Sequence, residues 1–288
     1  MRTQELAPAK INLALDILGR RADGYHELRM VMQTVSLCDV ITVEEGGTGF
    51  TLLTGEAFSL PADKVSMEQR AAEAFFAALG VPVPPLTVRL EKNIPAFAGL
   101  GGGSADVAAL LRCLRRLYAA GMPDEALRAI GLTVGSDVPF CVSGGTSLAE
   151  GRGERLTDLP PLPVCQIVLC KPDFGISTPE LFVLADGAVL SKRPDIAGLT
   201  AALQGGELTG VTDRLCNVFE EFLPERYREV FRIKEILLAH GALNAVMSGS
   251  GPTVYGIFES AAEAQRAAEV LKKSYQQTYV AKPVKKLV

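Results

Sequence analysis

Residues 95–105 read Pro95-Ala-Phe-Ala-Gly-Leu-Gly-Gly-Gly-Ser-Ala105, and a segment with apolar residues at 107, 110, 111, 114, 117 and 118 follows directly. That spacing predicts a helix that begins at the end of the glycine run. Glycines lack a Cβ, so their backbone amides can approach an anion closely, and the helix dipole adds partial positive charge there. The stretch therefore indicates a phosphate site, with a glycine-rich turn that binds no ligand as the alternative.

The glycine loop departs from two widespread phosphate-binding patterns. No Gly-Lys-Ser or Gly-Lys-Thr closes it, as a Walker loop requires, and it lacks the Gly-x-Gly-x-x-Gly opening of a dinucleotide fold. The chain before the loop also lacks the strand–helix–strand order with which a Rossmann unit begins. By itself the loop predicts phosphate binding but no particular enzyme.

The start of the chain predicts antiparallel strands. Residues 9–18 alternate polar and apolar side chains, which is typical of a strand with one buried face and places Lys10 and Asn12 on the same side. Turn residues occupy 19–24, and one or two further strands are expected over 28–43. The other elements expected in the first half are a helix over 67–79, a strand over 86–90, a helix over 123–132 and a strand over 144–150.

A domain boundary is expected shortly after residue 150. A Gly/Arg/Glu stretch at 151–155 precedes prolines at 160, 161 and 163, so we expect domains over 1–155 and 156–288. The second half predicts an α+β layer domain with helices on one sheet face. Its expected elements are a strand over 164–170, helices near 178–185, 196–204, 212–222 and 225–240, a strand over 243–247, and then a further strand, helix and strand.

Composition excludes several classes of protein. With 288 residues, two domains that share a cleft are expected rather than one large core. A net charge of −4 argues against a nucleic-acid partner, because such proteins concentrate Lys and Arg. The six cysteines form no Cys-x-x-Cys pair and only two histidines accompany them, so zinc is not expected. Neither a signal segment nor a run of about 20 apolar residues is evident, so we expect a cytoplasmic protein without a membrane partner.

Four polar residues are candidates for chemistry, and each has an ordinary structural alternative. Asp137, within Gly135-Ser-Asp-Val-Pro-Phe140, could accept a proton from a substrate hydroxyl or could cap a helix or turn. Lys10 could stabilise developing charge or be a solvated edge charge. Tyr25 and His26 follow a glycine turn and could hold a planar base, or fill surface or core space. A second glycine–serine turn, Met247-Ser-Gly-Ser-Gly-Pro-Thr253, is expected to be a tight connection between two strands.

Taken in order, five motifs resemble those of the GHMP kinase superfamily and span nearly the whole chain. Within it, the opening Ala-Lys-Ile-Asn-Leu followed by Gly-Tyr-His resembles the branch that phosphorylates cytidyl-linked methylerythritol, rather than mevalonate, homoserine or galactose kinases. The motifs are Pro8-Ala-Lys-Ile-Asn-Leu13, Gly24-Tyr-His26, Pro95 to Ala105, Gly135-Ser-Asp-Val-Pro-Phe140 and Ser248-Gly-Ser-Gly-Pro-Thr253.

The resemblance implies a two-domain α+β fold, with a ribosomal-protein-like N-terminal lobe, a ferredoxin-like C-terminal lobe and the active site between them. It also implies transfer of the ATP γ-phosphate to the 2-hydroxyl of that small-molecule substrate, in the route to isoprenoid precursors. ATP and Mg²⁺ are the implied cofactors, with Ser104 as a candidate magnesium ligand. We expect a monomer or homodimer.

The same resemblance implies roles for particular residues. Asp137 would be the catalytic base and Lys10 a neighbouring catalytic residue, while Asn12, Tyr25, His26 and Lys92 would belong to the substrate or nucleotide pocket. A catalytically silent GHMP-like binding protein is the alternative, which the presence of both Lys10 and Asp137 disfavours. ATP phosphates would bind along the glycine loop, at Pro95, Ala96, Phe97, Ala98, Gly99, Leu100, Gly101, Gly102, Gly103, Ser104 and Ala105.

Overall fold

The structure, a computed structural model, describes residues 1–55 and 65–287. Its longest strands, β1 (Arg2–Arg20) and β2 (His26–Glu45), form an antiparallel hairpin in the larger of two sheets. Within the described residues this sheet has seven strands, in the order β3-β4-β2-β1-β8, with β5 paired to β2 and β6 paired to β5. Besides β1 and β2, the strands of this sheet are β3 (Phe50–Thr54), β4 (Leu86–Glu91), β5 (Thr146–Gly151), β6 (Arg155–Asp158) and β8 (Cys216–Asn217).

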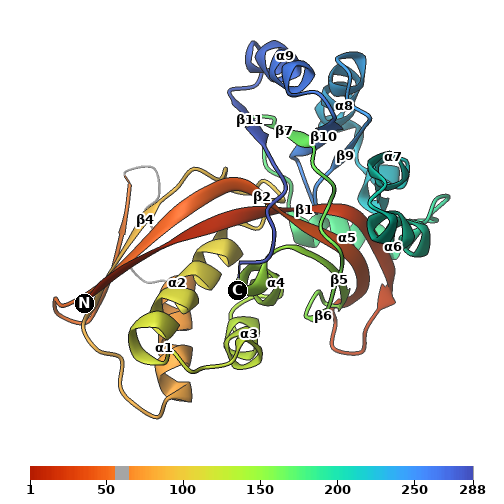
Figure 1. Ribbon diagram of the computed structural model, residues 1–288. Helices are drawn as coiled ribbons and strands as arrows, with labels where there is room; N and C mark the ends of the chain where they lie inside the picture. The colour runs from red at the N-terminus through yellow and green to blue at the C-terminus, as the bar shows by residue number, and fades with distance from the viewer. Residues whose placement is uncertain (56–64, 288) are drawn as a thin grey trace.

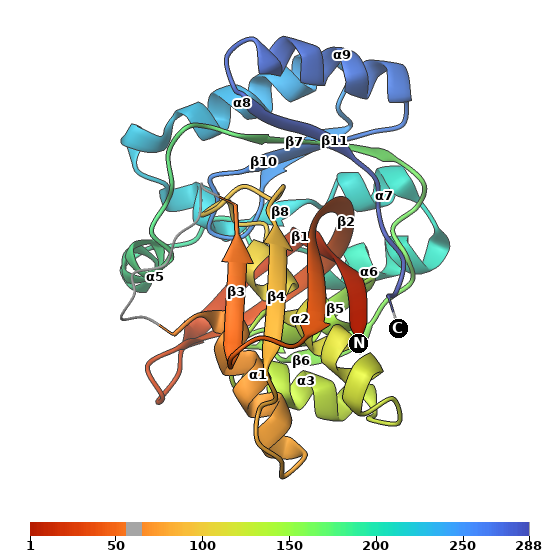
Figure 2. The same cartoon turned by 90° about the vertical axis from the view of Figure 1, so that its left-hand side faces the viewer.

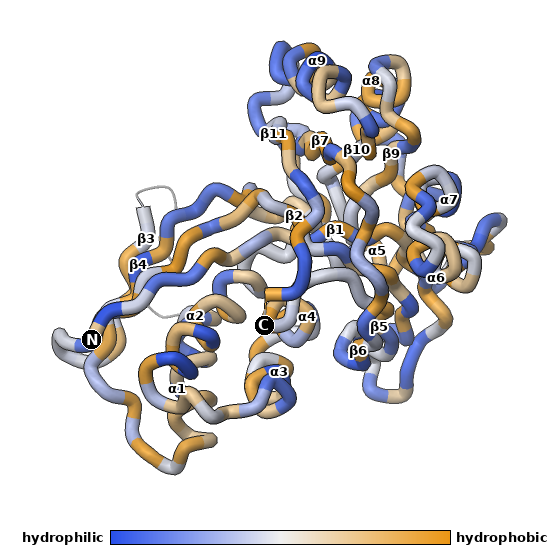
Figure 3. The backbone as a smooth tube through the Cα atoms, viewed as in Figure 1, coloured by the Kyte–Doolittle hydropathy of each residue, from blue (hydrophilic) through white to orange (hydrophobic). Residues whose placement is uncertain are grey.

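Four helices lie together beside the larger sheet (Figures 1 and 2). The central helix α2, which the helical spacing of its apolar residues predicted, packs against both β1 and β2 through a buried apolar face. The turn between β1 and β2 is hydrophilic and lies away from these helices (Figure 3). The four are α1 (Met67–Ala78), α2 (Gly102–Tyr118), α3 (Asp124–Leu132) and α4 (Val138–Ser143).

The second half forms a smaller antiparallel sheet, in the order β11-β7-β10-β9, with α8 and α9 on its outer face (Figure 2). The expected α+β architecture with helices on one sheet face is confirmed. Three further helices, α5, α6 and α7, connect β7 to β8; α5 packs against β1, and α6 packs against α7 (Figure 1). The bounds are β7 (Gln166–Lys171), α5 (Thr178–Asp186), α6 (Ile196–Gly205), α7 (Leu208–Thr212), α8 (Glu229–Ala239), β9 (Asn244–Met247), β10 (Val254–Phe258), α9 (Ala261–Lys272) and β11 (Gln277–Ala281).

The expected helix over 212–222 is wrong. The chain instead leaves α7, forms the two-residue strand β8 parallel to β1, and continues as a 3₁₀ helix, η1 (Val218–Phe222). Asn217 is extended, with φ −131° and ψ 113°, and its side chain bonds to the second glycine–serine turn. These tertiary hydrogen bonds override the local helical pattern. The helix expected over 225–240 is likewise divided, into η2 (Glu225–Tyr227) and α8.

The change from one sheet to the other lies a few residues beyond the expected boundary at 155/156. Strand β6 pairs with β5 through Leu156–Ala149 and Thr157–Leu148, so residues 155–158 belong to the larger sheet. The chain enters the smaller sheet at Gln166. We therefore place the boundary within 159–165, where the prolines lie. Turn residues at 151–155 mark a hairpin instead, which has the same local composition as a linker.

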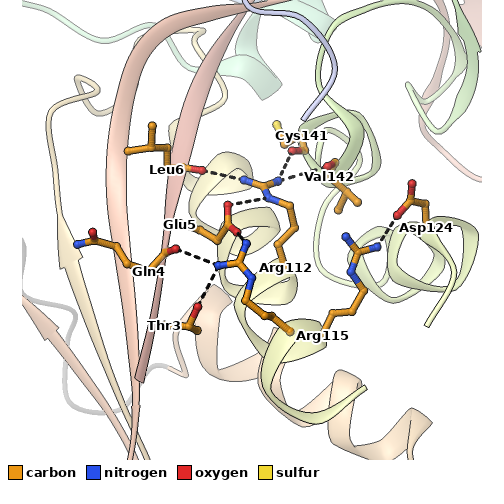
Figure 4. Close-up of polar contacts among 10 residues, drawn as sticks. Thr3, Gln4, Glu5, Leu6, Arg112, Arg115, Asp124, Cys141 and Val142 are labelled. Atoms are coloured by element: carbon orange, nitrogen blue, oxygen red, sulfur yellow. Dashed lines mark hydrogen bonds and ion pairs between the residues drawn. The ribbon is translucent and has the colours of Figure 1, made fainter. Parts of the chain in front are cut away.

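A buried arginine on α2 ties β1 to α4. The Arg112 guanidinium donates to the carbonyls of Leu6 (2.8 Å), Cys141 (2.8 Å) and Val142 (3.3 Å), and it also pairs with Glu5 (Figure 4). Burial lowers its pKa, and Glu5 opposes that shift. A charge so far from water needs all of these acceptors. The contact fixes the relative positions of the two elements that carry Lys10 and Asp137.

No helix in the described part of the chain is long and apolar enough to cross a bilayer.

Candidate active site

Two cavities meet at the glycine loop. One, of about 700 Å³, opens between the β1–β2 turn, α5 and the start of α4. The other, of about 980 Å³, lies between the glycine loop, β3 and the start of α1. We call the first the hairpin cavity and the second the loop cavity. Both are lined by Phe97, Gly99, Gly101, Ser104 and Thr178. Ligands bound in the two cavities would therefore approach one another at the loop.

The glycine loop lines both cavities and leads into the N-terminus of α2. Gly101 has φ +68° and precedes the first turn of α2, where no side chain caps the helix. The first amides of α2 are thus available to an anion, with the helix dipole favouring negative charge. Every residue from Pro95 to Ser104 lines the loop cavity, whereas Ala105 is buried within α2.

Close backbone contacts hold the glycine loop against the second domain. A Cβ at Gly99 would lie 2.1 Å from the Ser248 carbonyl oxygen, so no other residue fits there without movement. The Ser248 hydroxyl donates to the Gly99 carbonyl (3.0 Å). Asn217 in turn donates to the carbonyls of Met247 and Gly249, both at 2.8 Å. The second glycine–serine turn is therefore a tight connection between two strands, and it also supports the glycine loop at residues 95–105.

Lys10 and Asp137 face each other in the hairpin cavity. Lys10 Nζ lies 3.4 Å from Asp137 Oδ2 and donates to Asn12 Oδ1 at 2.8 Å. Strand β1 has register shifts between Pro8 and Lys10 and between Asn12 and Ala14, and such irregularities re-aim side chains. Asp137 begins α4 but makes no capping hydrogen bond, so the capping alternative does not hold. Lys10 is buried, while the Asp137 side chain keeps about a third of its surface open to the cavity.

Asn12 lies beside Lys10 but lines neither cavity. Its side chain is fully buried, between the Lys10 ammonium and the Met30 sulfur. Its carbonyl accepts a hydrogen bond from the Tyr255 hydroxyl of β10 at 2.8 Å. Asn12 thus fixes β1 to the second domain and orients Lys10, although the resemblance implied a place in the substrate or nucleotide pocket.

Tyr25 and His26 both line the hairpin cavity, at its turn end. Tyr25 is 54% exposed, and the Arg152 guanidinium lies 4.3 Å from its ring centroid. The His26 ring stacks on Phe182 (4.6 Å between centroids, 19° between planes), and its Nε2 is 2.8 Å from Asp186 Oδ1. The aromatic end of the cavity is therefore built from both domains.

Sequence reasoning missed Arg152, Phe182 and Asp186. Phe182 and Asp186 are four residues apart and share one face of α5, yet nothing in the sequence of that helix distinguishes a cavity-facing ring from a core ring. Arg152 belongs to the Gly/Arg/Glu stretch whose composition predicts a domain boundary. Only the packing of α5 and of the β5–β6 hairpin against the β1–β2 turn identifies these residues.

Lys92 lies in the loop cavity, away from Tyr25 and His26, within a cluster of two buried carboxylates. It contacts Asp39 closely and Asp106 at 2.6 Å. Burial would lower the pKa of Lys92, but Asp106 and Asp39 outweigh it and raise that pKa. Burial raises the pKa of Asp106 to about 8, with Lys92 opposing and Asp39 adding to the shift. Asp39 also accepts backbone amides of residues 93 and 94, so it anchors the start of the loop.

No group of three His, Cys, Asp or Glu side chains suited to a metal occurs among residues 1–55 and 65–287. Ser104 lines both cavities and Asp137 lines one of them. Magnesium commonly takes only one or two protein oxygens and completes its shell with substrate phosphates and water. The hydroxyl of Ser104 and the carboxylate of Asp137, which both line the hairpin cavity, are oxygens of the kind that magnesium takes.

Comparison with known proteins adds family matches to both halves of the chain. The description "GHMP kinases N terminal domain" matches residues 67–145, and "GHMP kinases C terminal" matches residues 200–277. A curated protein of Caldicellulosiruptor bescii, "4-diphosphocytidyl-2-C-methyl-D-erythritol kinase", is 40% identical over 92% of this chain and 93% of its own length. A protein of Clostridium acetobutylicum with the same description is 37% identical over 96% of this chain and 99% of its own.

Solved structures agree with these matches. A crystal structure of 4-(cytidine 5'-diphospho)-2C-methyl-D-erythritol kinase superposes with a TM-score of 0.82 at 33% identity, covering 98% of this chain and 99% of the other. A homoserine kinase from Cytophaga hutchinsonii reaches 0.75 at 20% identity over 99% of this chain and 95% of its own. The second likeness concerns the fold alone.

Proposed function

The chain belongs to the GHMP kinases, in their 4-diphosphocytidyl-2-C-methyl-D-erythritol kinase branch, and from this membership we propose the reaction that its two cavities perform. The enzyme transfers the γ-phosphate of ATP to the 2-hydroxyl of 4-diphosphocytidyl-2-C-methyl-D-erythritol, giving ADP and the 2-phosphate. This is a step of the methylerythritol phosphate pathway to isoprenoid precursors.

The observation that carries the mechanism is the Lys10–Asp137 pair beside the junction of the two cavities. We assign ATP to the loop cavity, with its phosphates on the amides of the glycine loop, and the cytidyl substrate to the hairpin cavity. Phosphoryl transfer depends mainly on positioning and charge neutralisation. The site supplies positioning and charge neutralisation, because the N-terminus of α2, the Lys10 ammonium and the Asp137 carboxylate lie near the place where the two cavities meet.

In the proposed step the oxygen of the substrate 2-hydroxyl bonds to the γ-phosphorus, and the bond between that phosphorus and ADP breaks. Asp137 accepts the proton that the hydroxyl loses. The Lys10 ammonium stabilises the charge that develops on the transferring group, and Asn12 holds that ammonium in place. Magnesium, held by the ATP phosphates with Ser104 and Asp137 nearby, would neutralise phosphate charge. Lys92, in the loop cavity, belongs to the nucleotide side.

Selection of the cytidyl group is assigned to the aromatic end of the hairpin cavity. Tyr25 can stack on the cytosine face, and His26 can bond to its edge. The Arg152 guanidinium lies over the Tyr25 ring, and its charge also helps to lower the pKa of Asp23. From this position it can supply positive charge to an anionic substrate. Location in the cytoplasm and a monomeric or homodimeric state stay predictions from the sequence.

The test measures both products, ADP and phosphorylated acceptor, from Mg-ATP with the cytidyl substrate, mevalonate and homoserine. Wild type should turn over the cytidyl substrate alone. Asp137→Asn should lose about 10²-fold or more in kcat, because a positioned base contributes that much. An Asp137→Asn enzyme with near wild-type kcat would remove the base assignment. ATP binding without turnover of any acceptor would favour the silent binding protein.

A further inference from the structure

Phe97 is an unusual residue for a phosphate loop. It is the one non-glycine residue with positive φ, +51°, among the described residues. Bulky side chains rarely adopt this backbone conformation, because the Cβ approaches the backbone too closely. The residue is also 81% exposed, so burial of the side chain does not offset that strain. A glycine at this position would bind phosphate through the same amide at lower steric cost.

Phe97 lies where the two domains and the two cavities meet. A Cβ on Gly175 of the second domain would come within 3.4 Å of Phe97 Cβ. The next residues are fixed, because the Ala98 carbonyl accepts the Thr253 amide (3.3 Å) and the Gly99 carbonyl accepts the Ser248 hydroxyl. The backbone under Phe97 is therefore held on its C-terminal side by contacts to the second domain. These contacts present the ring to the space between the cavities.

The junction has little other apolar bulk. Five residues line both cavities, and the other four are two glycines, a serine and a threonine. Strained residues cluster at functional sites, where their geometry serves a ligand. Phe97 is therefore the one residue with a large apolar side chain among the five that line both cavities.

We propose that the Phe97 ring covers the point of phosphoryl transfer when both cavities are filled, and excludes water from the γ-phosphate. This rests on the proposed function, since it requires ATP in one cavity and a hydroxyl acceptor in the other. Water that reached the γ-phosphorus would bond to it in place of the acceptor oxygen. The bond to ADP would break, and inorganic phosphate would form with release of the water proton. An apolar cover suppresses this side reaction.

The experiment compares wild type with Phe97→Ala, Phe97→Gly and Phe97→Leu. Phe97→Ala removes the ring but keeps a Cβ at positive φ, whereas Phe97→Gly removes the ring and the strain together. Phe97→Leu keeps apolar bulk. ADP, inorganic phosphate and phosphorylated acceptor are quantified with Mg-ATP in the presence and absence of acceptor. Phe231→Ala, a partly exposed phenylalanine on α8 outside both cavities, is the matched control.

Phe97→Ala and Phe97→Gly should each raise inorganic phosphate per phosphorylated acceptor severalfold, and Phe97→Leu should raise it less, while Phe231→Ala stays close to wild type. Unchanged phosphate release in both ring-deleted variants would overturn the proposal. An effect in Phe97→Gly alone would also overturn it, because backbone strain rather than the ring would then be responsible. If wild type fails to phosphorylate the cytidyl acceptor, the proposed function fails and the cover fails with it. If wild type phosphorylates the acceptor but the ring-deleted variants release no additional inorganic phosphate, the cover alone fails.

Discussion

Asp137 shows how a tertiary contact decides between two roles that the sequence leaves open. Aspartate at the start of a helix usually accepts amides of the first turn. Here the carboxylate makes no such bond and faces the Lys10 ammonium instead. Both side chains come from elements joined by the buried Arg112, so their meeting depends on packing that lies far from either residue in sequence.

Tyr25 should contribute to substrate affinity rather than to the chemical step. Its exposed ring lies at the end of the hairpin cavity away from the glycine loop. Stacking of a base on an aromatic ring contributes about 1–3 kcal/mol, so Tyr25→Ala should raise KM for the cytidyl substrate about 10-fold with kcat nearly unchanged. Tyr25→Phe, which keeps the ring, should behave as wild type. Steady-state kinetics at saturating ATP measure both, and an unchanged KM in Tyr25→Ala would remove the stacking role.

Asp106 should make stability depend on pH. Burial raises its folded-state pKa to about 8, against about 3.9 in the unfolded chain. The folded protein therefore binds one proton more than the unfolded chain between these values. That contribution to stability is fully present below about pH 4 and is lost as pH rises toward 8. A raised carboxylate pKa thus favours the fold in acid, opposite to the usual effect of a salt-bridged aspartate.

Asp106→Asn tests this directly, because the amide keeps the shape and removes the titration. Relative to wild type, the variant should gain up to about 4 kcal/mol of unfolding free energy between pH 5 and pH 9, because each pH unit between 5 and 8 contributes about 1.4 kcal/mol. Urea unfolding at both pH values measures the difference. The prediction fails if the variant loses as much stability relative to wild type at pH 9 as at pH 5, since Asp106 would then be ionised throughout.

At the scale of elements, the glycine loop is held in place by contacts with the second domain. Gly99 has φ +74° and lies against the Ser248 carbonyl, so Gly99→Ala meets both strain and a steric clash. The loop must move, and misplacement of a reacting group by about 1 Å can lower kcat/KM about 10²-fold. Gly99→Ala should therefore lower kcat/KM, and steady-state kinetics at varied ATP concentration measure this loss against wild type.

Gly80→Ala is the matched control for this prediction. Gly80 has a similar φ, +70°, but nothing lies within 4 Å of an added Cβ. Gly80→Ala therefore carries the backbone strain alone, about 1–2 kcal/mol, and should leave kcat/KM near wild type. Equal losses of activity in the two variants would attribute the effect to general strain rather than to the contact with Ser248.

On the scale of the whole molecule, the C-terminal tail returns from the smaller sheet to the larger one. The amides of Val284 and Leu287 donate to the carbonyls of Thr34 and Ser143, each at 2.9 Å. Gln33 Nε2 donates to the Val284 carbonyl, and Lys286 pairs with Asp158 at 2.7 Å. The tail therefore binds β2, the end of α4 and β6, in the domain opposite to the strand that it leaves (Figure 1).

A chain that ends at Lys282 should unfold at lower temperature. The truncated chain loses these contacts and exposes their backbone partners. Each kcal/mol of unfolding free energy lost lowers the unfolding midpoint by about 2–4 °C in a domain of 150–250 residues. Differential scanning calorimetry measures the midpoint, with Lys286→Ala as the control that removes one exposed ion pair and should change it little. A truncated chain with the wild-type midpoint would show that the tail does not stabilise the fold.

The sequence by itself determined the elements with strong local patterns and the motifs that carry chemistry. The alternation over β1, the apolar spacing of α2 and the glycine run before it are local features, and propensity and periodicity act over just such short windows. For the same reason Lys10, Asp137, Tyr25 and His26 could be singled out, since the motifs that contain them are contiguous in sequence.

Only the tertiary structure decided which of these residues meet. The strand at Asn217 replaced an expected helix because its amide bonds to a turn some 30 residues away. Phe182 and Arg152 entered the site because α5 and the β5–β6 hairpin pack on the β1–β2 turn. Local sequence does not contain such long-range contacts, and their energies exceed the small differences in propensity between helix and strand.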